Sequence, residues 1–99
     1  MSLQRKKEAK TVRREVRITN KLGLHARPAA EFVRRANAFR SEVWLVKEGR
    51  RYSASSLIEI MRANIEGGAI ATLEAWGSDA DAAIERLATL LEQFRDLED

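Results

Sequence analysis

Residues 23–36 read Gly-Leu-His-Ala-Arg-Pro-Ala-Ala-Glu-Phe-Val-Arg-Arg-Ala, and they decide the fold because the hydrophobic period changes within them. From this point the apolar residues recur at helical spacing and form one stripe: Ala29, Phe32, Val33, Ala36 and Phe39. Pro28 suits the first turn of such a helix, because its fixed φ and missing N–H are tolerated there. The sequence therefore predicts a helix that begins near Ala26, directly after His25.

The rest of the chain divides into short elements by the same criterion. Before the first helix we expect a half-buried strand at 15–19 and a loop at 20–25. After it we expect a strand at 43–46, a hairpin turn at 47–50 and a returning strand from 51 to 53. The chain then continues with a short helix from 57 to about 62, a strand at 69–75 and a last helix that begins at Gly77 and Ser78. Strands with hairpin-like connections and segregated helices predict an α+β domain. In that domain an antiparallel sheet has one face covered by helices.

Length and composition limit the classes of protein that this chain can be. Its 99 residues suffice for one domain with one core. The absence of cysteine excludes disulfides and thiolate metal sites, and it fits a reducing cytoplasm. No apolar run approaches the roughly 20 residues that a membrane-spanning helix needs, and the N-terminus lacks the apolar segment of a secretory signal. We expect a soluble cytoplasmic protein without membrane insertion.

The positive charge is concentrated at the N-terminus. Residues 1–14 hold six basic groups and one acidic group, whereas residues 15–99 hold 12 basic and 14 acidic groups. The sequence therefore predicts a basic, flexible extension at 1–14 and a folded domain at 15–99. Two other uses of the extension stay open: contact with an acidic protein and weak binding of nucleic acid.

His25 and Arg27 are the residues with the clearest chemical potential. The first turn of a helix leaves backbone N–H groups unpaired, and the helix dipole makes that end partly positive. A phosphoryl group on His25 could accept those N–H bonds, and Arg27 would add a cation with donors matched to phosphate oxygens. Histidine is largely neutral near pH 7 and is then nucleophilic. The pattern predicts a site that accepts and releases a phosphoryl group.

The same residues also allow other interpretations. A histidine at a helix start can simply be a capping or surface residue. His25 is the only histidine and there is no cysteine, so we predict no metal site, and no Ser-His-acid arrangement indicates a hydrolase. A small nucleic-acid-binding domain that uses the basic extension is a remote alternative, because the tryptophans, Tyr52 and the phenylalanines form no evident series for base stacking.

The motif at 23–30 resembles the active-site signature of HPr, the histidine-containing phosphocarrier of the bacterial phosphoenolpyruvate-dependent sugar phosphotransferase system. The resemblance runs from about Glu15 to Leu91 and leaves residues 1–14 outside it. It includes Glu31-Phe32-Val33, Ser41-Glu42-Val43, Ser53-Ala54-Ser55-Ser56-Leu57 and Gly77-Ser78-Asp79, in the same order and spacing. It implies the HPr-like open-faced sandwich, a four-stranded antiparallel sheet with three helices on one face.

The resemblance also implies a role for each matching residue. His25 would be phosphorylated on Nδ1 by phosphorylated enzyme I and would pass the group to IIA domains of sugar permeases. Arg27 would match the arginine that stabilises the phosphoryl group. The chain would need no cofactor and would act as a monomer, a carrier in a relay rather than an enzyme with its own turnover. A paralogous carrier of the nitrogen-related or regulatory branch is the alternative.

Three further groups of residues match family positions. Ser56 matches the serine that an HPr kinase/phosphorylase modifies in many bacteria, although the sequence alone favours an ordinary N-cap role for it. The resemblance implies an apolar surface for partners formed by Leu57, Ile58 and Met61, joined by Leu24. Candidates for a cationic rim around it are Lys21, Arg34, Arg35 and Arg62.

Overall fold

The computed structural model describes residues 10–97, which form a four-stranded sheet and three helices. The elements are, in chain order, β1 (Lys10–Arg17), α1 (Ala26–Ala36), β2 (Glu42–Lys47), β3 (Arg50–Ser53), α2 (Leu57–Arg62), β4 (Ile70–Gly77) and α3 (Ala80–Leu97). This order is the one that the hydrophobic periods predict. Both the helix that starts at Ala26 and the short helix that starts at Leu57 begin where they were expected.

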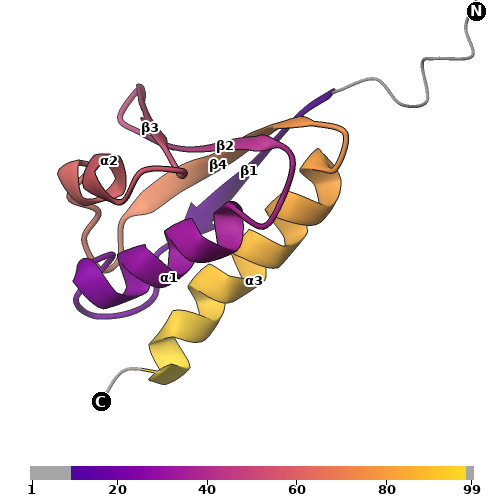
Figure 1. Cartoon of the computed structure of the whole chain (residues 1–99). Helices are drawn as coiled ribbons and strands as arrows, with labels where there is room; N and C mark the ends of the chain where they lie inside the picture. Colours follow the sequence, from indigo (N-terminus) through magenta and orange to yellow (C-terminus); the bar gives the residue numbers. More distant parts are fainter. Residues whose placement is uncertain (1–9, 98–99) are drawn as a thin grey trace, which may run out of the picture.

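The sheet has the strand order β1-β4-β2-β3, and each neighbouring pair is antiparallel. The helices lie together on one side of it (Figure 1), with α3 packed on β1 and β4, α2 on β3, and α1 against both other helices. The opposite face of the sheet is open. The expected open-faced sandwich is therefore confirmed.

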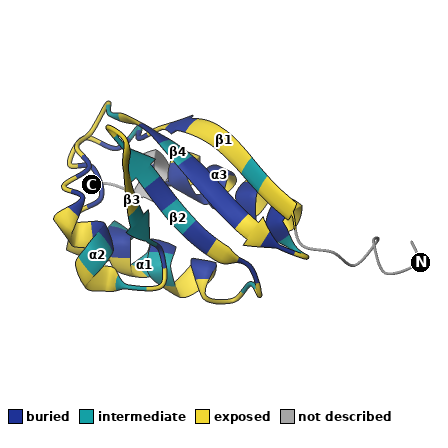
Figure 2. Ribbon diagram, turned by 90° about the horizontal axis from the view of Figure 1, so that it is seen from above, coloured by how far each residue is buried: buried dark blue, intermediate teal, exposed yellow. Residues whose placement is uncertain are grey.

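The core lies between the sheet and the helices. The largest fully buried apolar side chains come from every layer: Phe32, Ile18, Leu45, Ile60, Leu73, Leu87 and Leu91. Figure 2 shows buried residues concentrated in the two central strands, β4 and β2, and exposed residues along much of the edge strand β1. The predicted stripe of α1 faces this core, because Ala29, Phe32 and Ala36 are buried and Val33 and Phe39 pack against its margin.

The start of β1 corrects the expected boundary between the extension and the domain. The strand begins at Lys10, so residues 10–14 belong to the sheet, where they pair with residues 73–77 of β4. The basic side chains of residues 10–14 make this part of the strand look like a solvated extension in the sequence. Arg13 binds Glu74 at 2.5 Å and Lys10 binds Asp81 at 2.5 Å, while Val12 packs against the core. Residues 1–9, the rest of the expected extension, lie outside the described residues.

Asp79 ties the start of α3 to the segment between α1 and β2. Its carboxylate oxygens accept hydrogen bonds from the backbone N–H groups of Arg40 and Ser41, each at 2.9 Å, and from the Ser41 hydroxyl. The hydroxyl of Ser41 and the N–H of Arg40 lower the pKa of Asp79. The carboxylate therefore fixes the segment between α1 and β2 relative to the start of α3 at neutral pH. Within residues 10–97 no helix is apolar and long enough to cross a bilayer.

Candidate functional site

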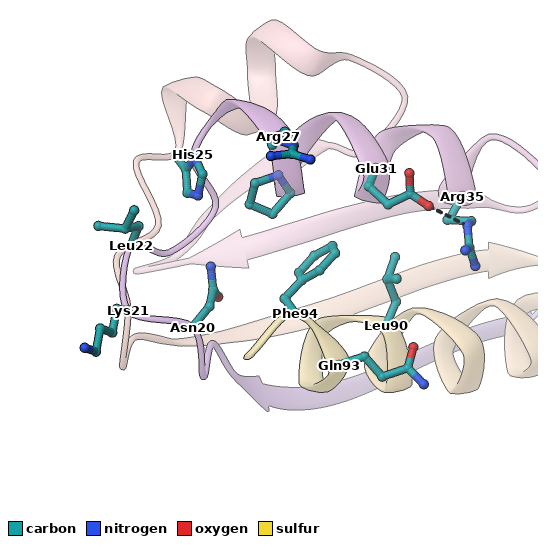
Figure 3. A pocket seen from close by; sticks show the side chains of 11 residues that line it. Asn20, Lys21, Leu22, His25, Arg27, Glu31, Arg35, Leu90, Gln93 and Phe94 are labelled. Carbon is teal, nitrogen blue, oxygen red and sulfur yellow. Dashed lines mark hydrogen bonds and ion pairs between the residues drawn. The ribbon is translucent and has the colours of Figure 1, made fainter. Parts of the chain in front are cut away.

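His25 is the N-cap residue of α1. Its backbone is extended, with φ −79° and ψ −171°, and its carbonyl oxygen accepts the first bond of the helix from Ala29 at 2.9 Å. Its side chain makes no capping hydrogen bond. The residue is exposed, and its imidazole stands at the positive end of the helix (Figure 3). The side chain of His25 therefore does not cap the helix, although its backbone occupies the N-cap position.

The loop before His25 is held by a compact set of hydrogen bonds. The side-chain amide of Asn20 donates to the Gly23 carbonyl oxygen at 2.6 Å, and Gly23 N–H donates back to the Asn20 carbonyl oxygen at 3.2 Å. Leu24 N–H donates to the carbonyl oxygen of Ile65 at 2.9 Å. Gly23 has a φ of +69°, and a Cβ there would collide with that same Ile65 oxygen. The loop thus needs glycine at this position.

Arg27 is the second residue of α1 and is exposed. Among the residues that the structure describes, no side chain forms a hydrogen bond or ion pair with its guanidinium. The next residue, Pro28, has no N–H. The backbone N–H groups of Ala26 and Arg27 therefore remain at the helix start as donors without a helical partner. An anion carried by His25 would meet these two donors and the guanidinium together.

A cleft of about 770 Å³ opens beside His25 between α1 and the C-terminal half of α3. Figure 3 shows His25, Arg27, Glu31 and Arg35 following one another along one wall, with Leu90, Gln93 and Phe94 on the opposite wall. Its remaining lining residues are Asn20, Lys21, Leu22 and Pro28. The structure thus brings His25 and Arg27 together at one end of the cleft.

Several lining residues were not predicted from the sequence. Asn20 is only 1% exposed, and its Oδ1 has no partner among the described residues. Glu31 accepts bonds from Arg34 Nη2 at 2.6 Å and from Arg35 Nε at 2.8 Å. The bond from Arg34 is the main cause that lowers the pKa of Glu31. The spacing of these three residues on one helix was the available sequence signal.

Ser56 caps α2, as the sequence predicted. Its Oγ accepts a hydrogen bond from Glu59 N–H at 3.2 Å, and its backbone is extended. The Glu59 carboxylate in turn accepts from Ser53 N–H at 3.2 Å. The serine hydroxyl is thus engaged in holding the helix start, and the negative charge of Glu59 lies one turn away.

The expected apolar surface for partners is exposed on α2. Ile58 is 70% exposed, Met61 43% and Leu57 38%. Leu24 does not belong to this surface, because it is only 4% exposed and packs in the core. Its neighbour Leu22, 69% exposed, is the apolar residue that the loop presents instead. The sequence could not distinguish the two, since both lie in the same irregular segment.

Comparison with known proteins agrees with this geometry. A family model described as "PTS HPr component phosphorylation site" matches residues 12–93. The chain is 40% identical over 82 residues to HPr-like protein Crh of Bacillus subtilis, covering 83% of this chain and 96% of Crh. It is 38% identical over 81 residues to phosphocarrier protein HPr of Vibrio cholerae, covering 82% of this chain and 95% of that one.

A solved structure of HPr from Thermoanaerobacter tengcongensis has the same fold. It superposes with a TM-score of 0.83 at 38% identity, over 89% of this chain and 99% of that chain. The family match extends across nearly the whole described domain and includes the segment around His25. The chain therefore belongs to the HPr family of phosphocarrier proteins of the phosphotransferase system.

Proposed function

We propose that this HPr-type protein accepts a phosphoryl group on Nδ1 of His25 from phosphorylated enzyme I and passes it to IIA proteins or domains of sugar permeases. One observation supports the proposal most directly. The imidazole of His25 is exposed at the start of α1 and makes no capping hydrogen bond, and the neighbouring Arg27 has no partner among the described side chains. The family's relay supplies the donor and the acceptor, and this end of the cleft supplies the place where the group is held.

The chemistry is a displacement at phosphorus. In the reacting form of the histidine, Nε2 carries the proton and the lone pair of Nδ1 attacks. The bond between phosphorus and the donor's leaving atom breaks as the Nδ1–P bond forms. The transferred group carries negative charge on its three peripheral oxygens. The guanidinium of Arg27 and the N–H groups of Ala26 and Arg27 stabilise this charge. In a second displacement a nucleophile of IIA attacks phosphorus, the Nδ1–P bond breaks, and the group passes to IIA.

The partners dock beside the histidine on exposed apolar residues. Leu57, Ile58 and Met61 form an apolar surface on α2, which packs against α1, and Leu22 adds a further apolar side chain on the loop. A carrier must bind two partners in turn and leave both, so a small apolar surface surrounded by cations is appropriate. Such a relay operates in the cytoplasm, and residues 10–97 contain no helix that could cross a membrane.

Ser56 is a proposed regulatory site for an HPr kinase/phosphorylase. Phosphorylation would replace the bond between its Oγ and Glu59 N–H, and it would add negative charge close to the Glu59 carboxylate. The phosphate would remain at the N-terminus of α2, where unpaired backbone N–H groups can donate hydrogen bonds to it. Incubation with such a kinase tests whether Ser56 is phosphorylated, and Ser56→Ala is the control that should stay unmodified. A wild-type protein that also stays unmodified would refute the site.

A regulatory carrier is the second candidate, and the similarity to Crh favours it. A solved structure describes Crh as the Bacillus subtilis catabolite repression HPr. The two candidates differ in the fate of the phosphoryl group on His25. A sugar carrier hands it to IIA, whereas a regulatory carrier retains it or receives none from enzyme I.

The test follows labelled phosphate through the relay. The protein is incubated with enzyme I and radiolabelled phosphoenolpyruvate, separated from enzyme I, and then mixed with purified IIA. We expect acid-labile label on this chain that moves to IIA, and Arg27→Ala should slow both steps by roughly ten- to a hundredfold. Label that stays on this chain with every IIA tested would favour the regulatory role.

A further inference from the structure

Glu31 lies on the wall of the His25 cleft and is bound by two arginines that follow it on α1. Its Oε2 accepts from Arg34 at 2.6 Å and from Arg35 at 2.8 Å. Arg27 lies one turn before Glu31 on the same helix and lines the same cleft, yet Glu31 makes no ion pair with it. Figure 3 shows Glu31 directed toward Arg35.

The helix explains why Glu31 selects the later arginines. Residues four apart on a helix are neighbours, so Glu31 could pair with Arg27 or with Arg35. An acid that precedes its base by four residues is the more favourable order, because both charges then agree with the helix dipole. The order Glu31, Arg35 satisfies this rule and the order Arg27, Glu31 does not. Arg34, three residues after Glu31, adds a second donor.

The pairing has a consequence for phosphoryl transfer. A Glu31 without its two arginines would be a bare carboxylate one turn from the guanidinium that the phosphoryl group needs. It would compete with the phosphoryl group for Arg27 and would repel the incoming charge. A glutamate carboxylate is ionised at neutral pH, and the bonds from Arg34 and Arg35, which lower the pKa of Glu31, pair its charge.

We propose that Arg34 and Arg35 are positioning residues for phosphoryl transfer, because they hold Glu31 and thereby leave Arg27 free for the group on His25. The inference rests on the proposed function of His25. It differs from a docking role for the same arginines, in which they would contact acidic residues of a partner. The two roles predict different rates in a reaction without a protein partner, because only the positioning role would then affect phosphorylation of His25.

The experiment uses phosphoramidate, a small phosphoryl donor, and measures the rate of His25 phosphorylation in the full chain by intact mass. The compared proteins are wild type, the double variant Arg34→Gln/Arg35→Gln, and a triple variant that also carries Glu31→Gln. A matched control, Arg50→Gln/Arg86→Gln, removes two exposed arginines that lie outside the cleft. Circular dichroism confirms that each variant is folded.

We expect the double variant to react roughly three- to tenfold more slowly than wild type, which is the size of effect expected from one solvent-screened charge interaction at the surface. The triple variant should recover to within about twofold of wild type, because the competing carboxylate is gone. The control should react at the wild-type rate. Recovery to near the wild-type rate is the decisive observation, because Glu31→Gln restores only one of the two lost units of net charge and none of the lost side-chain pairing on the helix.

Two results overturn the inference. A double variant as fast as wild type would show that Glu31 does not compete for Arg27. A double variant that is slow and stays slow after Glu31→Gln would assign the loss to the arginines themselves. A wild-type chain that takes no phosphoryl group on His25 would refute the proposed function as well, and that outcome is distinct from the other two.

Discussion

Asn20 and Gly23 are joined by a side-chain hydrogen bond of 2.6 Å that closes the loop leading to His25. The donor is the Asn20 amide and the acceptor is the Gly23 carbonyl oxygen. Because Asn20 is 1% exposed, water cannot replace this bond without opening the loop. The position of His25 at the start of α1 therefore depends on a residue five positions earlier in the chain.

Asn20→Ala should lower the free energy of unfolding by about 0.5–1.5 kcal/mol, because it removes a buried hydrogen bond to the Gly23 carbonyl oxygen, which then keeps only the bond from His25 N–H. Urea denaturation measures the loss. Asn37→Ala is the control, since Asn37 is exposed at the C-cap of α1, and it should change stability by less than about 0.5 kcal/mol. Equal stabilities of the two variants would contradict the role assigned to Asn20.

Gly23→Ala should destabilise the protein more than Gly49→Ala. Both glycines have positive φ, +69° and +80°, and each alanine would cost about 1–2 kcal/mol for that conformation. Only Gly23 is crowded: a Cβ there meets the Ile65 carbonyl oxygen, whereas at Gly49 it meets nothing. The collision adds about 1–3 kcal/mol to the cost at Gly23. Equal midpoints of thermal unfolding would disprove the close approach.

The contribution of Asp79 to stability should disappear in acid. Hydrogen bonds from Ser41 and Arg40 lower its pKa in the folded state below the value of about 3.9 expected in an unfolded chain. The stabilisation is therefore complete above the unfolded pKa and is lost as the pH falls through the folded pKa. Asp79→Asn should be less stable than wild type at pH 7, and the gap should narrow steadily below about pH 4. A gap independent of pH would contradict this linkage.

Ser56→Ala should lower stability by about 0.5–2 kcal/mol, because it removes the acceptor that caps α2. Ser56→Asp keeps an acceptor at the same position and should stay within about 0.5 kcal/mol of wild type. Urea denaturation distinguishes the two. If both variants lose the same stability, the contribution of Ser56 lies in its packing rather than in its hydrogen bond to Glu59.

The elements with local signals could be predicted from the sequence. The apolar stripe after Ala29 and the position of Pro28 define the start of α1, and Ser56 marks the start of α2. The start of β1 was misjudged because its basic residues resemble a solvated extension. Their acidic partners, Glu74 and Asp81, lie more than 60 residues away and become visible only in the sheet.

The candidate site also contains some residues that could be predicted from the sequence and others that could not. His25 and Arg27 could be predicted because the requirements for binding an anion at a helix start are local. The opposite wall of the cleft could not, because Leu90 and Phe94 reach it through the packing of α3 against α1. Leu24 and Leu22 have the same character in sequence, and only tertiary contacts decide that Leu24 is buried and Leu22 exposed.

The most direct test of the central claim is the intact mass of the protein after incubation with phosphoenolpyruvate and enzyme I. Wild type should gain one phosphoryl group that brief acid treatment removes, and His25→Ala should gain none. An acid-stable modification, or an equal gain in His25→Ala, would show that His25 is not the phosphoryl acceptor.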